Sequence, residues 1–168
     1  MKITAEYKGK QVTFDVPDEA LDKLIEEPKK TGWEKPEVGG QRYWYVDHQG
    51  QAQPSCWSNE PIDHRRYSIG NCFTSKELAE NIARYTSLDR RIRRRIAEVC
   101  EPIDFDGKKN RYYFYFHYAD NKFHVNSFCK TQHVMWWCDT EEHAEQITNE
   151  FREELMWYFT EFKDRMDG

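Results

Sequence analysis

Arginine is the residue type best placed to do chemistry in this sequence, because five arginines fall within six consecutive positions. They are Arg90, Arg91, Arg93, Arg94 and Arg95. Arg84 lies a little upstream. Guanidinium groups bind phosphates and carboxylates through paired hydrogen bonds, so the cluster indicates a contact surface for a nucleic acid or an acidic protein. The alternative is a solvated helix face that is neutralised by neighbouring acids, namely Glu77, Glu80, Asp89 and Glu98.

The C-terminal segment is the acidic counterpart of this cluster. Residues 139–168 hold ten acidic and three basic residues, a balance of 3 − 10 = −7 against −5 for the whole chain. Such a segment imitates a phosphate backbone, pairs with a basic face on a second copy, or is an ordinary acidic surface helix. Trp157 falls off the apolar spacing, which indicates a wider buried face or an interface anchor. Besides the six arginines, the candidate binding residues are Arg65, Arg66, Glu150, Glu153, Glu154 and Trp157.

No catalytic motif accompanies these charges. The sequence has no glycine-rich phosphate loop, no His-Glu-x-x-His, no Gly-x-Ser-x-Gly and no Cys-x-x-Cys. Asp104-Phe105-Asp106-Gly107 begins like a calcium loop but lacks the later ligands, so we expect a turn there. The six histidines and five cysteines show no zinc-ribbon spacing. We therefore expect no enzyme, no cofactor and no metal site.

Composition predicts a folded, soluble, cytoplasmic protein. Aromatic residues make up 15% of the 168 residues, which is too many for a disordered chain. The N-terminus shows no signal peptide, and no apolar run approaches the roughly 20 residues that span a bilayer. An odd number of widely spaced cysteines suits reduced thiols. We expect no membrane partner, and the two oppositely charged segments predict a homodimer.

The elements that position these residues predict an α+β fold. Residues 1–30 read as an N-terminal ββα module, residues 31–40 as a linker, and residues 41–168 as the main domain. Within the main domain, residues 41–101 and 111–166 form two similar ββ(β)α units with antiparallel sheet. Each unit begins with an arginine and aromatic residues, and each ends in a long helix, about 75–100 and 140–165. The two helix starts are predicted to be capping boxes, Thr74 with Glu77 and Asp139 with Glu142.

The segment between the first hairpin and the first long helix is polar. It runs from Asp63 through Arg65 and Arg66 to Asn71, and we expect an exposed loop there. Loops of this composition often carry function.

Three stretches resemble a family of small accessory proteins from phages and prophages of Gram-positive, especially clostridial, bacteria. They are Arg42-Tyr43-Trp44-Tyr45-Val46-Asp47, the pair Asp63 and Arg66, and residues 69–80. Residues 151–161 are similar to the C-termini of that family, and residues 1–27 resemble a module that such phages attach to varied domains. The family has no catalytic signature, and Arg66, Gly70 and Asn71 match it without a functional role to carry over.

The resemblance implies a protein that acts in the host cytoplasm, where several products of such gene neighbourhoods inhibit bacterial immunity. Our leading expectation is an inhibitor of anti-CRISPR type that binds a CRISPR effector nuclease or its nucleic-acid complex. Two alternatives stay open. One is a DNA- or RNA-binding accessory protein that uses the arginine cluster, and the other is a binder of nucleotide signalling molecules. Salt-sensitive binding of plain nucleic acid would favour the first, and uptake of a cyclic nucleotide without a protein partner would favour the second.

Overall fold

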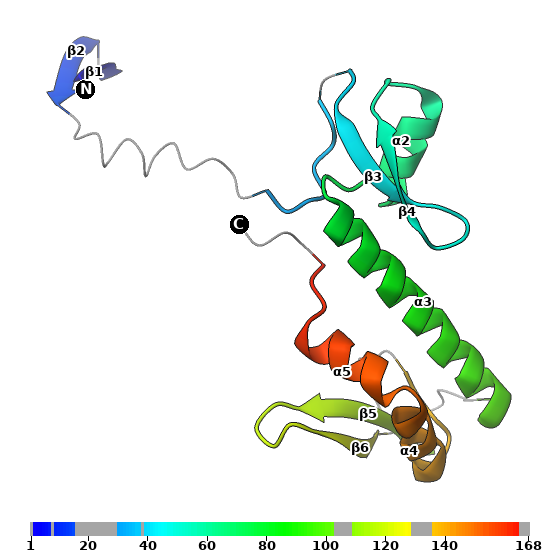
Figure 1. Cartoon of the computed structure of the whole chain (residues 1–168). Coiled ribbons are helices and arrows are strands. Elements are labelled where there is room, and N and C mark those ends of the chain that lie inside the picture. The colour runs from blue at the N-terminus through cyan, green and yellow to red at the C-terminus, as the bar shows by residue number, and fades with distance from the viewer. Residues whose placement is uncertain are drawn as a thin grey trace. The chain divides into compact units, whose positions relative to one another are not determined.

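The computed structural model describes residues 2–7, 9–15, 30–37, 39–102, 109–128 and 136–164. The chain divides into two compact units, Met1–Thr31 with Asp167–Gly168, and Gly32–Met166 (Figure 1). The first unit holds strands β1 (Lys2–Tyr7) and β2 (Lys10–Asp15), which pair in antiparallel fashion. The helix expected between residues 17 and 28 lies outside the described residues, as does the turn expected at residues 104–107.

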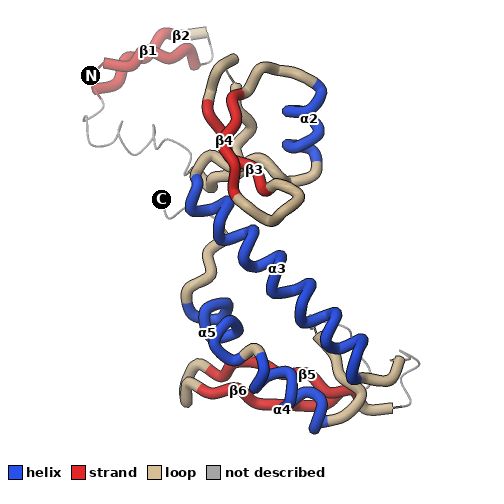
Figure 2. The backbone as a smooth tube through the Cα atoms, turned by 45° about the vertical axis from the view of Figure 1, so that its right-hand side comes forward, coloured by secondary structure: helices blue, strands red, loops and turns tan. Residues whose placement is uncertain are grey.

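Within its described residues, the second unit contains two hairpins and four helices, which confirms the α+β fold class (Figure 2). Its elements in chain order are β3 (Arg42–Val46), β4 (Ala52–Cys56), α2 (Pro61–Ser68), α3 (Lys76–Val99), β5 (Arg111–His117), β6 (Lys122–Phe128), α4 (Glu141–Glu150) and α5 (Arg152–Thr160). The β3–β4 and β5–β6 pairs are antiparallel two-stranded sheets. Trp33 also belongs to this unit and packs edge-on against Phe73, with ring centroids 4.9 Å apart.

The two hairpins are extended in the same way before the helix that follows each. Trp44 of β3 exchanges two backbone hydrogen bonds with Phe73, and Tyr112 of β5 exchanges two with Cys138. Phe73 lies two positions before Ser75, which caps α3, and Cys138 lies two positions before Thr140, which caps α4. This shared plan is what the two predicted ββ(β)α units require.

The helix starts lie one residue later than the sequence pattern indicated. Ser75 caps α3 by accepting a hydrogen bond from the backbone of Leu78, and Thr140 caps α4 by accepting one from His143. The predicted boxes at Thr74 and Asp139 are therefore wrong. Phe73 and Cys138 are held in sheet pairing, and this fixes the chain direction up to the hydroxyl residue two positions on, where the helix can begin.

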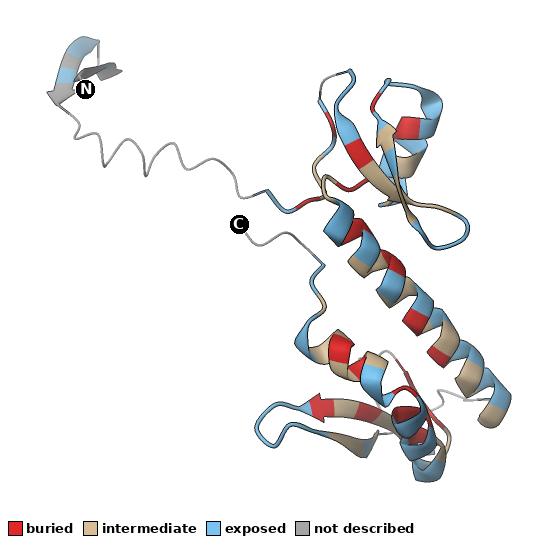
Figure 3. Cartoon of the chain, viewed as in Figure 1, coloured by how far each residue is buried: buried red, intermediate tan, exposed pale blue. Residues whose placement is uncertain are grey.

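Helix α3 contributes to two separate clusters of buried residues (Figure 3). Near its start, Leu78 and Ala79 pack with Phe73 under the β3–β4 hairpin. Near its end, Leu88 and Ile92 pack with residues of the other hairpin and of the C-terminal helices, Phe114, Trp136, Ile147 and Leu155. The apolar stripe predicted along residues 78–99 therefore holds both halves of the unit together.

The long helix expected over residues 140–165 is two helices. α4 ends and α5 begins at Phe151, whose backbone has φ −104° and ψ 17°. Phe151 is buried in the larger cluster, and the break lets α4 cover the β5–β6 hairpin while side chains of α5 reach α3. Tertiary packing overrides the helical spacing at this point.

The predicted loop at residues 63–71 is also corrected, because most of it is helix α2. Pro61 occupies the first turn, where its missing N–H costs nothing, and Asp63 lies in the same turn, where a negative charge is favourable.

Candidate binding groove beside the β3–β4 turn

The basic and acidic segments face each other within one chain. Arg91 of α3 forms an ion pair with Glu154 of α5. Arg95 donates a hydrogen bond to Glu150 at the end of α4, 2.8 Å away. These contacts use two of the arginines and two of the acids that the sequence marked as candidates for binding a partner.

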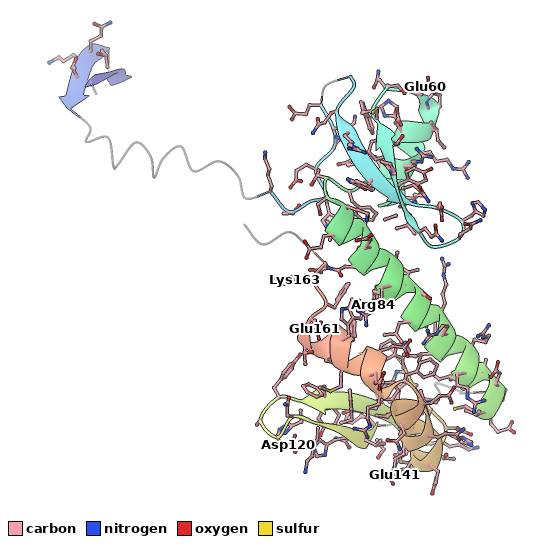
Figure 4. The ribbon with its side chains drawn as sticks, in the orientation of Figure 1. Glu60, Arg84, Asp120, Glu141, Glu161 and Lys163 are labelled. Atoms are coloured by element: carbon pink, nitrogen blue, oxygen red, sulfur yellow. The ribbon has the colours of Figure 1, made fainter. Side chains whose placement is uncertain are left out.

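The Arg84 side chain points toward α5 (Figure 4), and its guanidinium lies 3.8 Å from the ring centroid of Trp157. Trp157 itself is 7% exposed. The indole is therefore part of a wider buried face and cannot serve as an exposed interface anchor. Both features on which the homodimer prediction rested are accounted for inside a single chain.

The remaining arginines of the cluster differ from one another. Arg93 pairs with Asp89 at 2.9 Å, and Arg94 lies 3.9 Å from Glu98. Arg90 is the one member of the cluster that has neither an acidic nor an aromatic partner among the described residues. Its positive charge is available to a ligand.

Arg90 lines a groove of about 400 Å³ between α3 and the β3–β4 turn. The turn, residues 47–51, contributes Asp47 and His48 to the groove. Ile69 and Asn71, which follow α2, form another part of the wall, and Ser87 lies on the helix one turn before Arg90. The groove thus combines one unpaired guanidinium with an aliphatic side chain, Ile69, that is 67% exposed.

The Asp47 carboxylate, which also lines the groove, shapes the turn. It accepts hydrogen bonds from the backbone N–H groups of Gln49 and Gln51, at 2.8 and 2.9 Å, and from the Gln53 amide at 3.1 Å. The bond from Gln51 is the largest influence on the Asp47 carboxyl, whose pKa is held below its usual value. The Asp47 carboxylate therefore stays charged while it accepts the hydrogen bonds that hold the turn.

The part of the wall that follows α2 is held against β3 by the Asn71 side chain. Its Oδ1 accepts a hydrogen bond from the Val46 N–H at 2.7 Å, and its Nδ2 donates one to the Val46 carbonyl at 2.8 Å. The amide thereby satisfies both backbone groups at the end of β3. Gly70, at φ +68°, makes the left-handed bend that brings Asn71 to the strand.

Arg66, predicted as a binding residue, is half-buried and is held by side chains of β3. Its guanidinium lies 3.5 Å from the ring centroid of Tyr45 and donates a 2.8 Å hydrogen bond to the Tyr43 hydroxyl. That hydroxyl donates in turn to the buried Asp63 carboxylate at 2.7 Å. Arg66 is therefore a structural residue, whereas Arg65 on the same helix is exposed and its side chain has no partner among the described residues.

Asp63 is the centre of this network. Burial by itself would raise the pKa of its carboxyl, but hydrogen bonds from Tyr43, Ser58 and Glu60 outweigh burial and lower the pKa to about 2. The carboxylate thus stays charged and holds the start of α2 against the hairpin. This arrangement keeps Ile69, at the other end of α2, in the groove wall.

Sequence reasoning missed two side-chain clusters. Cys100, Asp139 and His143 meet where α3 ends and α4 begins, and His117, Asp120 and His124 meet at the β5–β6 turn. The i,i+4 spacing of Asp139 and His143 is visible in the sequence, but nothing local places Cys100 beside them.

Comparisons with protein-family models, with curated proteins and with solved structures give no match to this chain. Within the described ranges, no helix has the length and apolar character needed to cross a membrane. The groove and its residues therefore carry the functional argument.

Proposed function

We propose that this protein is a binding protein without catalytic activity, and that it holds an acidic segment of a partner protein in the groove beside the β3–β4 turn. Arg90 is the residue that binds the partner's carboxylate, and Ile69 supplies the adjacent apolar contact. The observation that carries the proposal is the Arg90 guanidinium in this groove, which has no acidic or aromatic partner in the described part of the chain. Arginine flanked by apolar surface is a frequent hot spot of protein interfaces.

A protein partner is favoured over a nucleic acid by the state of the other arginines. Binding to a polyanion draws its strength from several cationic groups acting on successive phosphates. Here Arg91 and Arg95 are already paired with acids of the same chain, and Arg84 covers an indole ring. Arg90, the arginine that lines the groove, and Arg94 one helical turn away suit a short acidic peptide segment.

The family resemblance supplies the identity of the partner in this proposal. It indicates an inhibitor of host immunity, so the proposed partner is a CRISPR effector nuclease that presents an acidic segment to the groove. Occupation of that segment would block the binding or cleavage of nucleic acid by the effector.

The test is a DNA-cleavage assay with a purified CRISPR effector from a clostridial host. We expect the wild-type chain to inhibit cleavage and Arg90→Glu to lose most of that inhibition. Arg93→Glu is the matched control, because it changes the net charge equally on the same helix outside the groove. Equal inhibition by both variants would remove the groove from the proposal, and an unaffected effector would remove the CRISPR partner.

A further inference from the structure

The cluster of Cys100, Asp139 and His143 has the composition of a metal site. Cys100 ends α3, Asp139 precedes the cap of α4, and His143 lies in the first turn of α4. One ligand atom from each residue lies within 4.8 Å of the others. Cys100 and Asp139 are separated by 38 residues in the chain, so the meeting of the three side chains depends on the tertiary fold.

The atoms of this cluster are fixed in place by the surrounding structure. Asp139 Oδ1 lies 2.6 Å from His143 Nδ1, and its Oδ2 accepts a hydrogen bond from the backbone N–H of Glu101 at 3.0 Å. Cys138, the neighbour of Asp139 in the chain, is fully buried. The backbone of Cys138 is held by two hydrogen bonds to Tyr112.

We infer that Cys100, Asp139 and His143 bind a zinc ion, with water in the fourth position. Thiolate, imidazole and carboxylate together suit Zn²⁺, whereas Mg²⁺ and Ca²⁺ require oxygen ligands. Zinc–ligand bonds of about 2.0–2.3 Å place neighbouring donors roughly 3–4 Å apart, so the present spacing needs only a small contraction. On binding, the Cys100 thiol releases its proton to solvent, and any proton at His143 Nδ1 is likewise given up as the metal replaces the hydrogen bond between Asp139 and His143.

The exposed cluster at the β5–β6 turn is a natural comparison. Asp120, at the tip of the hairpin (Figure 4), contacts His117 Nδ1 at 3.0 Å and His124 Nε2 at 2.8 Å. It contains no thiol, and the Asp120 side chain is 40% exposed. Charge-transfer absorption from a metal-bound thiolate would therefore report on the Cys100 cluster and not on the Asp120 cluster.

The zinc site would join the end of the first ββ(β)α unit to the helix of the second. The free energy of zinc binding would then stabilise the contact between α3 and α4. This inference does not depend on the binding groove, which lies at the other hairpin.

The experiment is a titration of the reduced, metal-free full chain with Co²⁺, a spectroscopic substitute for Zn²⁺. We expect thiolate-to-cobalt charge-transfer absorption with tetrahedral d–d bands, both abolished by Zn²⁺, and a higher melting temperature with Zn²⁺. Cys100→Ser and His143→Gln should each weaken binding at least about tenfold. Cys56→Ser, which alters an exposed thiol elsewhere, and His124→Ala should bind as the wild type does.

Affinity should fall as the pH is lowered, because protons compete for the thiolate and imidazole. Absence of the charge-transfer band in the wild-type chain would overturn the inference, even if a variant failed to fold. It would also be overturned if the band survived in Cys100→Ser, or if His124→Ala alone abolished binding.

Discussion

Arg95 and Glu150 lie 55 positions apart in the sequence, yet the guanidinium of the first donates to the carboxylate of the second across 2.8 Å. This contact, with the Arg91–Glu154 pair beside it, makes the basic and acidic segments complementary parts of one fold. Two of the arginines and two of the acids that the sequence offers to a partner are thus paired within the chain. Arg90, in the groove, has no acidic or aromatic partner among the described residues.

The Arg95–Glu150 contact predicts that reversing the charge at Arg95 destabilises the fold. Arg95→Glu places a third carboxylate beside Glu150 and Glu98, so the melting temperature should fall. The double variant Arg95→Glu/Glu150→Arg restores the pair in reverse and should recover most of the loss. Additive effects of the two single variants in a double-mutant cycle would show that the pair does not form.

The Arg84–Trp157 contact predicts two effects of different size. Trp157→Ala removes a buried indole and should lower the free energy of unfolding by about 3–5 kcal/mol. Arg84→Ala leaves the indole but removes the cation above it, a loss of about 0.5–2 kcal/mol. Urea denaturation measures both. Arg84→Lys keeps the charge and should fall between wild type and Arg84→Ala, whereas a wild-type value for Arg84→Ala would contradict the contact.

The buried Asp63 carboxylate predicts a pH-dependent stability. Its pKa is about 2 in the folded chain against an ordinary value of 3.8, so its contribution is complete above about pH 4–5 and is lost as the pH falls toward 2. The difference in unfolding free energy between wild type and Asp63→Asn should therefore shrink across that interval. A difference that stays constant from pH 5 to about pH 2 would mean that the carboxylate is not preferentially charged in the fold.

The Asn71 amide predicts that this position tolerates little change. Asn71→Ala removes both hydrogen bonds to Val46 and should cost about 1–3 kcal/mol in unfolding free energy. Asn71→Asp keeps the acceptor for the Val46 N–H but loses the donor to its carbonyl, so it tests the two bonds separately. Faster hydrogen exchange at the Val46 amide in Asn71→Ala, but not in Asn71→Asp, is the expected signature.

Helix α3 was predictable because its apolar residues recur at three- and four-residue steps from Leu78 to Val99. The break at Phe151 was not, because Ala144, Ile147, Phe151 and Leu155 continue the same spacing through it. Helix α2 carried readable signals, namely Pro61 and Asp63 in its first turn, which the polar composition of the segment masked.

The candidate site was predictable only in part, because ion pairing is a tertiary property. The sequence marked eight arginines as candidates, six of them between residues 84 and 95, and it did not say which of them would meet Glu150 or Glu154. The groove exists because the β3–β4 turn lies over α3, a contact between residues about 40 positions apart. The Cys100 cluster is hidden for the same reason.

The most direct measurement of the central claim is photo-cross-linking from a reactive amino acid placed at Ser87, inside the groove, and at Glu145, on the exposed face of α4. With host lysate, we predict a cross-link from position 87 to one protein, identified by mass spectrometry as a CRISPR effector, and its loss when Arg90→Glu is added. Position 145 should give none. Cross-links from both positions alike, from nucleic acid alone, or undiminished by Arg90→Glu would contradict the assignment of the groove as the partner-binding site.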